Sequence, residues 1–408
     1  MILMVNNMYD VYISRVCCKP FDEEVFEAVK RSIEKLGGVK SFAKPGDNVL
    51  VKPNICSNDL HRTTDRRIYY YLAILFRDYG CNVTIGENPV IDTPSKKVFM
   101  RNEIKRIAEK SGVRVVNFRF DEYRVVKVPS PKLFTKLEVT KYALEADLIV
   151  NVPIMRKHGL SGLTLGIKNL FGLVSLNQRH IIHSRNLYWG LVEIYRLFKD
   201  KLRLTVMDGI NAALNGTLYP LGLIVFGKNI LAVDIVTSYL LGWDPFELET
   251  NRYASQMNLG PKGLSEIRID GISMNEINKI RETTKQYFNP ELERLEDVAD
   301  RLGIKLVLGD ICPTCRRNIT KILREFRKED FKNKNIAIIA GPGAIPLKDR
   351  VNIIIGECLK KYAGEGIFVN YCPTYLSDIK SAIEYAIGRR EERRYLWEGL
   401  IQLISNPI

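Results

Sequence analysis

The chain has 408 residues, of which 46% are apolar and 26% charged, and its 61 Lys and Arg against 47 Asp and Glu give a net charge of +14. This length and composition exclude a disordered or collagen-like chain and predict two or three domains with a large buried core. Because no apolar run reaches the roughly 18 residues of a membrane span and the first ten residues do not resemble a signal peptide, we expect a cytoplasmic protein without membrane contacts.

Segments typical of strands and helices alternate along the first 270 residues, which predicts an α/β fold with a mostly parallel sheet and crossover helices. Most of the strand segments are short apolar runs, as expected for strands covered on both faces. The expected strands are 48–51, 82–85, 113–117, a more exposed one at 123–128, 147–152, 202–207 and 221–226. The expected helices are 25–36, 68–79, 187–198 and 232–241, and a Gly-rich loop region is expected at 156–184.

A polar stretch follows the first 272 residues and marks a domain boundary. We interpret 1–272 as a large α/β domain and 273–303, rich in Glu, Asn and Arg, as a helical linking segment. Residues 304–408 are then a smaller α/β domain. Its expected strands are 305–308, 335–340, 351–355 and 366–370.

A helix-like stretch at 316–334 has eight basic and three acidic side chains. RNA binding is one interpretation of this basic C-terminal helix, because clustered Lys and Arg attract phosphates. Phosphate-binding stretches usually have more one-sided charge. We therefore favour a solvated helix of a heat-adapted protein, since Lys, Arg, Glu and Ile are abundant throughout the chain.

Several motifs of the large domain together resemble one family of proteins. They are VLVKPN at 49–54, NVPIMRKHG at 151–159, GIKNLFGLV at 166–174, VMDGI at 206–210 and GKNILAVD at 227–234. They are similar to the uncharacterised family catalogued as domain of unknown function 362, over roughly residues 10–270. The resemblance implies a pocket of unknown chemistry, often accompanied by ferredoxin-type iron–sulfur modules.

The small domain has four cysteines in place of a ferredoxin motif, whose C-x2-C-x2-C-x3-C-P spacing is absent. They are Cys312 and Cys315 in ICPTC, Cys358 in GEC and Cys372 in YCP. This pattern resembles a C-terminal tail of archaeal members of the same family.

The four cysteines are candidate metal ligands because of their positions after strands. Cys312, Cys358 and Cys372 each follow an expected strand, and parallel strands bring the segments after them to one edge of the sheet. Four thiolates suit a [4Fe–4S] cluster or a zinc ion. We expect the cluster; zinc, redox thiols and simple packing remain alternatives, because the long separations after Cys315 weaken the spacing argument. Cys17, Cys18, Cys56 and Cys81 are expected to pack as small apolar groups.

The large domain holds the candidate catalytic residues. All four histidines fall in expected loops, and His158, His180 and His183 lie within 26 residues of one another, which favours an acid–base or ligand role. Lys52 ends a buried strand and is expected to face an anion, with a structural salt bridge as the alternative. Asp208 ends another strand and could bind a metal, accept a proton or cap a turn.

The candidate substrate-binding residues lie next to these groups in the sequence: Asn54, Asn151, Lys157 and Lys168. Together these residues predict a redox enzyme or redox partner that acts on an anionic small molecule and exchanges electrons with a partner protein. One alternative is a non-redox metal-dependent enzyme with a structural zinc site. A second is an RNA-binding protein.

Overall fold

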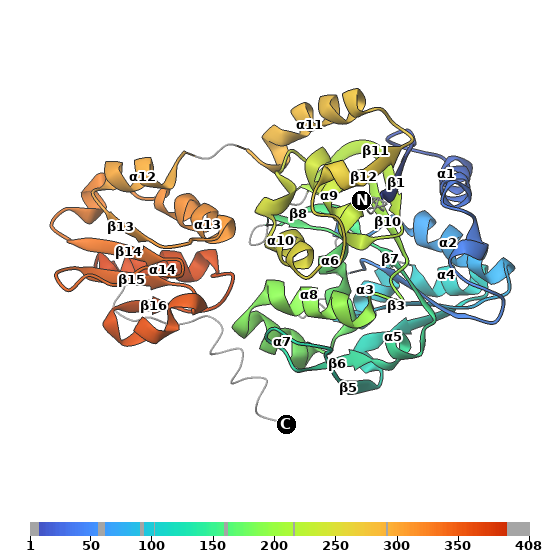
Figure 1. The fold of residues 1–408 in the computed structure, drawn as a ribbon, viewed down its shortest axis with the longest axis horizontal. Coiled ribbons are helices and arrows are strands. Elements are labelled where there is room, and N and C mark those ends of the chain that lie inside the picture. Colours follow the sequence, from blue (N-terminus) through green and yellow to red (C-terminus); the bar gives the residue numbers. More distant parts are fainter. Residues whose placement is uncertain are drawn as a thin grey trace, which may run out of the picture. The chain divides into compact units, whose positions relative to one another are not determined.

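The computed structural model describes residues 8–55, 62–89, 94–101, 103–158, 162–214, 217–290 and 293–389. The chain divides into two compact units (Figure 1). Unit 1 comprises Met1–Ile182 and Tyr188–Pro290, and unit 2 comprises His183–Leu187 and Glu291–Ile408. Both units combine helices with sheets that are largely parallel, so the α/β fold class is confirmed. In the described ranges no helix is both long and apolar enough to cross a membrane.

A ten-stranded sheet forms the centre of the described part of unit 1. Its main path is β12-β1-β11-β10-β7-β2-β3-β4, and β8 joins β9 to β10. The path from β10 to β4 is parallel, whereas β11 is antiparallel to β1 and β10. The bounds are β1 (Tyr9–Arg15), β2 (Asn48–Pro53), β3 (Asn82–Glu87), β4 (Arg114–Asn117), β7 (Leu148–Val152), β8 (Ile154–His158), β9 (Gly162–Thr164), β10 (Leu204–Leu214), β11 (Thr217–Gly227) and β12 (Ile267–Asp270).

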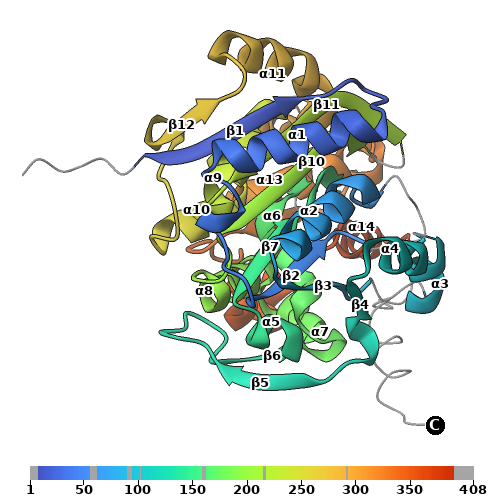
Figure 2. The same cartoon turned by 90° about the vertical axis from the view of Figure 1, so that its right-hand side faces the viewer.

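Helices cover both faces of this sheet (Figures 1 and 2). On one face, α1, α2 and α4 pack through a cluster that includes Val29, Leu72 and Ile107. On the other face, α9 packs on β10 and β11, and α6 packs against α9. The bounds are α1 (Asp22–Lys35), α2 (Arg66–Asp78), α3 (Ser95–Arg101), α4 (Ile104–Ser111), α5 (Lys141–Glu145), α6 (Gly166–Asn169), α7 (Leu176–Arg185), α8 (Leu187–Phe198), α9 (Ile230–Leu240), α10 (Glu249–Gln256) and α11 (Met274–Phe288).

One expected strand of unit 1 lies outside the large sheet, and one region expected to be a loop contains regular elements. The exposed strand expected at 123–128 forms β5 (Tyr123–Lys127), which pairs with β6 (Lys136–Thr140) in a separate two-stranded sheet. The loop region expected at 156–184 instead contains β8, β9, α6 and α7. Its short helix α6 forms because the buried carboxylate of Asp234, on α9, accepts the first N–H groups of α6. This cap comes from a distant part of the chain.

Unit 2 contains a four-stranded parallel sheet in the order β13-β14-β15-β16. Its core joins the sheet to three helices through residues such as Val298, Ile319 and Ile379. The bounds are β13 (Lys305–Leu308), β14 (Ile336–Ala340), β15 (Val351–Ile355), β16 (Ile367–Val369), α12 (Leu295–Leu302), α13 (Pro313–Leu323) and α14 (Leu376–Ala386). The expected strands agree with these bounds to within one residue at each end.

The basic stretch at 316–334 is not one helix, which corrects the sequence prediction. Helix α13 ends at Leu323, and a 3-10 turn follows at Lys328–Phe331. Phe326 and Phe331 are both buried, with ring centroids 5.7 Å apart. Both side chains belong to the hydrophobic core of unit 2. The expected linking segment 273–303 contains α11, which packs against α9 of unit 1, and α12, which belongs to the core of unit 2.

Candidate functional site

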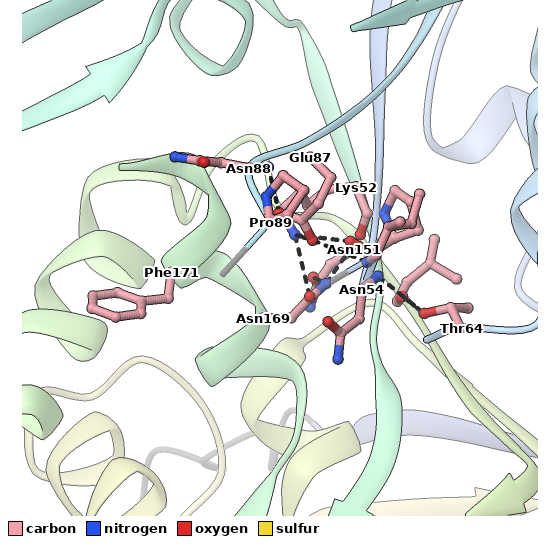
Figure 3. A network of polar contacts seen from close by, with 12 residues as sticks. Lys52, Asn54, Thr64, Glu87, Asn88, Pro89, Asn151, Asn169 and Phe171 are labelled. Atoms are coloured by element: carbon pink, nitrogen blue, oxygen red, sulfur yellow. Dashed lines mark hydrogen bonds and ion pairs between the residues drawn. The ribbon is translucent and has the colours of Figure 1, made fainter. Parts of the chain in front are cut away.

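A buried polar network joins the ends of β2, β3 and β7 to α6 (Figure 3). Lys52 Nζ donates hydrogen bonds to Glu87 Oε2 at 2.7 Å, to the Pro53 carbonyl at 2.8 Å and to Asn169 Oδ1 at 3.2 Å. Asn169 Nδ2 donates to Asn151 Oδ1 at 2.8 Å and to the Lys52 carbonyl at 3.0 Å. The network thus connects motifs that are more than 100 residues apart in the sequence.

Lys52 is placed as a structural group, which corrects its expected role opposite an anionic ligand. Its side chain is fully buried, and the anion that it faces is Glu87 of the same chain, which is 3% exposed. A buried ammonium needs a close counter-ion because its desolvation costs several kcal/mol. The salt bridge that the sequence left open as an alternative is therefore the observed arrangement.

Two glycines of the GIKNLFGLV motif pack directly against this network. A Cβ on Gly172 would lie 2.1 Å from Glu87 Oε1 and 2.5 Å from Lys52 Cε. A Cβ on Gly166 would lie 2.6 Å from Asp234 Oδ1. Asp234 accepts the N–H groups of Gly166 and Ile167, yet burial raises its pKa to about 7. The glycine spacing of the motif is thus explained by close packing around buried polar groups.

Two further predicted residues are buried: Asn54 directly follows β2, whereas Asp208 lies inside β10 and not at the end of a strand, where the sequence predicts it. Asn54 is 5% exposed, and its backbone N–H donates to Thr64 Oγ1 at 3.0 Å (Figure 3). Asp208 is buried, and its two oxygens accept the N–H groups of Asp65 at 2.7 Å and Ile210 at 3.0 Å. Burial and the charge of Asp65 raise the pKa of Asp208 to about 7. Because Asp65 caps α2, Asp208 anchors the start of that helix, and its catalytic role stays a prediction.

The three histidines in the described ranges lie on regular elements, not in the loops that the sequence predicts. His158 ends β8, and His180 lies on α7 in unit 1. Burial and the neighbouring Arg179 lower the pKa of His180, so its ring is neutral at neutral pH. His183 belongs to unit 2, and His61 lies outside the described residues.

The two predicted substrate lysines are only partly buried. Lys157 lies on β8, and its Nζ donates to the carbonyl of Tyr287. Lys168 lies on α6, directly before the network residue Asn169. Lys168 is thus the predicted lysine that lies beside the buried network while remaining partly accessible.

Arg179 is a buried residue that sequence reasoning missed. Its guanidinium donates to the carbonyls of Asn88 at 2.7 Å, Phe171 at 3.0 Å and Pro89 at 3.1 Å. Arg119 Nε adds a hydrogen bond to Asn88 Oδ1 at 2.9 Å. The two arginines therefore hold the segment after β3. The available signal was the NQRH sequence, in which only the histidine was considered.

Glu87 and Asn169 were also missed. Glu87 ends a buried strand, the same signal that drew attention to Lys52. Asn169 is part of the GIKNLFGLV motif but had no assigned role.

A cavity of about 440 Å³ lies on the other face of the sheet, between α1, α2 and α4. Its lining includes Arg66, Arg67 and Glu103, and the predicted site residues do not line it. Arg66 pairs with Glu103 at 2.6 Å, and Arg67 pairs with Asp65 at 2.6 Å. Its charges are thus largely compensated within the chain.

Three of the four cysteines of unit 2 follow strands of its parallel sheet, as the sequence predicts, and the fourth, Cys315, lies on α13. Cys312 follows β13 and caps α13, where its sulfur accepts the N–H of Cys315 at 3.4 Å. Cys358 follows β15 and Cys372 follows β16. Because the strands are parallel, these segments share the carboxyl edge of the sheet.

The thiols of this edge interact electrostatically. The pKa of Cys315 is raised well above its usual value by its hydrogen bond with Cys312, by burial, and by the charges of Cys312, Cys372 and Cys358. Desolvation and Cys312 also raise the pKa of Cys358. Cys315 thus lies within electrostatic reach of the other three thiols. Across the described ranges, no three or more His, Cys, Asp or Glu side chains are arranged to hold a single metal ion.

The segment before Cys372 has an unusual backbone. Tyr371 has φ of 79°, in the left-handed region that bulky residues rarely adopt. Such a conformation costs about 1–3 kcal/mol and persists only where the surroundings hold it, often at functional sites. The Tyr371 ring contacts the Tyr375 ring edge-on at 5.7 Å.

Cys17, Cys18 and Cys81 belong to unit 1, and the basic stretch begins directly after Cys315. Cys17 and Cys18 are exposed, which corrects their expected burial; Cys81 is buried, and Cys56 lies outside the described residues. In the basic stretch, Arg316 pairs with Glu296 at 2.5 Å, and Glu325 pairs with Lys380 at 2.6 Å. Part of its charge is therefore compensated locally, and RNA binding stays a prediction.

Comparisons with known proteins support the family resemblance. Residues 49–239 match the model described as "Domain of unknown function (DUF362)". The thylakoid-associated protein sll1697 of Synechocystis sp. is 26% identical over 248 residues, covering 57% of this chain and 75% of that protein. The lactate racemase apoprotein from Thermoanaerobacterium thermosaccharolyticum is 18% identical, with a TM-score of 0.33, over 51% of this chain and 52% of that chain. This chain thus matches about half the length of that solved structure.

Proposed function

With residues 49–239 matching the family described as a domain of unknown function, we propose that this protein is an iron–sulfur redox protein whose four C-terminal cysteines hold one [4Fe–4S] cluster. The observation that carries the proposal is the position of Cys312, Cys358 and Cys372 after strands of one parallel sheet, with the Cys315 N–H donating to Cys312 Sγ at 3.4 Å. Four thiols at one sheet edge match the number of ligands that such a cluster takes.

The charge of the four thiols supports a metal centre. The hydrogen bond with Cys312 and burial raise the pKa of Cys315, and negative charge on the neighbouring thiols raises it further. A bound metal centre reverses this balance, since its positive charge favours deprotonated ligands. N–H donors to the sulfurs are also in place, from Cys315 to Cys312 and from Asn186 Nδ2 to Cys372 at 3.4 Å. Such donors stabilise negative charge on ligand sulfurs.

When bound, the cluster supplies one-electron transfer. The chain's own residues hold the ligands: α13 positions Cys312 and Cys315, and the ends of β15 and β16 position Cys358 and Cys372. An electron-transfer partner protein is the partner that this role implies.

The substrate of this proposal is an anionic small molecule at the carboxyl edge of the large sheet. Lys168 supports it as a partly accessible cation beside the buried network. His180 supports it as a group that is neutral at neutral pH and can accept a proton. We expect inorganic phosphate or small carboxylates to raise the melting temperature of the wild type but not of Lys168→Met. An equal shift in Lys168→Met would contradict this placement, and Lys35→Met, at an exposed lysine of α1, is the control.

Metal analysis of anaerobically purified protein tests the cluster. We expect a brown protein with four irons and four acid-labile sulfides per chain. Cys315→Ser and Cys372→Ser should each lose most of the iron, because a cluster depends on all of its ligands. Cys81→Ser, which changes a buried thiol of unit 1, should retain it.

The outcomes separate the alternatives. One zinc ion per chain in a colourless protein would establish the structural zinc site and overturn the cluster. Metal-free protein with four titratable thiols in unit 2 would overturn both. Iron that persists in Cys315→Ser would show that the cluster lies elsewhere.

A further inference from the structure

Five residues from the middle of the chain belong to unit 2. The segment 183–187 is grouped with residues 291–408, although more than 100 residues separate the two parts in sequence. The segment also lies inside the region 49–239 that matches the family model. It therefore links a part of the family region to the C-terminal cysteine unit.

The segment holds Cys372 through two consecutive residues. Asn186 Nδ2 donates to Cys372 Sγ at 3.4 Å, and the Leu187 N–H donates to the Cys372 carbonyl at 2.8 Å. The sulfur and the backbone of one cysteine are thus both held by a segment far away in the sequence. Asn186 is half-buried, so its amide competes with little water for this contact.

A second contact holds the chain three residues after Cys372. The Tyr375 hydroxyl and His183 Nδ1 are 3.2 Å apart, within hydrogen-bond distance. The two rings are stacked, with centroids 6.3 Å apart and planes inclined by 25°. Tyr375 is the residue before α14, and its ring also touches Tyr371. The segment 183–187 therefore contacts both Cys372 and the residue three positions after it.

We propose that Asn186 is a positioning residue of the cysteine site that sets the reduction potential of its cluster through the hydrogen bond to Cys372 Sγ. This inference rests on the proposed function. Reduction adds one electron and thus negative charge to the cluster and its sulfur ligands, while no bond forms or breaks. An N–H donor stabilises that added charge, so it raises the potential.

The test is a redox titration of the purified holoprotein with dithionite and mediator dyes, followed by electron paramagnetic resonance. Asn186→Ala and Asn186→Leu remove the donor, and Asn186→Asp replaces it with an acceptor. We expect the first two to lower the equilibrium constant for reduction about tenfold, which is 59 mV for one electron. Asn186→Asp should lower it further. Asn177→Ala, which removes an exposed amide of α7, should leave it unchanged.

The outcomes distinguish this inference from the proposed function. Wild-type protein without iron would overturn both. Iron-loaded variants with the wild-type potential would overturn the role of Asn186 and leave the cluster in place. A merely structural role predicts lower iron occupancy with an unchanged potential in the loaded fraction, and that result would also overturn the inference. Tyr375→Phe, which keeps the ring but removes the hydroxyl, should shift the potential less than Asn186→Ala.

Discussion

Replacing Lys52 by Met tests whether the buried network holds the large unit together. The substitution leaves the Glu87 carboxylate buried without the ammonium that lies 2.7 Å away. The Pro53 carbonyl and Asn169 Oδ1 lose the same donor. Removal of one partner of a buried ion pair costs about 3–5 kcal/mol.

We expect a cost in the lower half of this range of about 3–5 kcal/mol, because Glu87 keeps two backbone hydrogen-bond donors. The N–H groups of Ile55 and Asn88 still reach its two oxygens, at 3.2 and 2.7 Å. We therefore expect Lys52→Met to lower the free energy of unfolding by about 3 kcal/mol. The double variant Lys52→Met with Glu87→Met removes the isolated charge and should recover part of this loss, although the two N–H groups then lack an acceptor.

Urea denaturation followed by tryptophan fluorescence measures this effect, since Trp189 and Trp243 both lie in unit 1. Lys35→Met is the control and should change the free energy by less than about 0.5 kcal/mol, as exposed substitutions usually do. A loss below about 1 kcal/mol in Lys52→Met would refute the reasoning, because a buried carboxylate without its counter-ion costs more than that. Such a result would return Lys52 to the role of a ligand-facing group.

Three further predictions concern the same unit. Gly172→Ala should lower the free energy of unfolding by more than about 2 kcal/mol, because the added Cβ would clash with Glu87 Oε1. The control Gly263→Ala has space for a Cβ and should not change the free energy of unfolding. Equal urea midpoints for the two variants would contradict this prediction. Burial raises the pKa of Asp234 from 3.8 to about 7, so the stability that its protonated form adds is present below its ordinary pKa and is lost as the pH rises through about 7. The free energy of unfolding of Asp234→Asn should therefore fall less than that of the wild type between about pH 4 and pH 8. Parallel pH profiles of the two proteins would disprove this. Glu193 accepts the N–H groups of Lys132, Leu133 and Phe134 at 2.6–2.8 Å, so Glu193→Gln should cost about 1–3 kcal/mol in thermal or urea unfolding, while the exposed Glu27→Gln should cost almost nothing.

The sequence by itself determined the four strands of unit 2 and the parallel strands β2, β3, β4 and β7 of unit 1, whereas β1, β6, β8, β9 and β12 were not expected. Short apolar runs located β13 and β15 to the residue, because burial on both faces leaves a clear local pattern. It also determined that Cys312, Cys358 and Cys372 share one sheet edge, since parallel strands place their following residues together.

Only the tertiary structure decided which groups pair. Lys52 pairs with Glu87, 35 residues away, and Asp234 caps α6 from α9, 68 residues after Gly166. The segment 183–187 reaches Cys372 across 186 residues, from Asn186. No local period or spacing encodes these contacts, because the partner of a buried charge or sulfur is a group that is distant in sequence and comes close only when the chain folds. The sequence therefore located the polar residues, and packing determined which of them became structural and which stayed available for function.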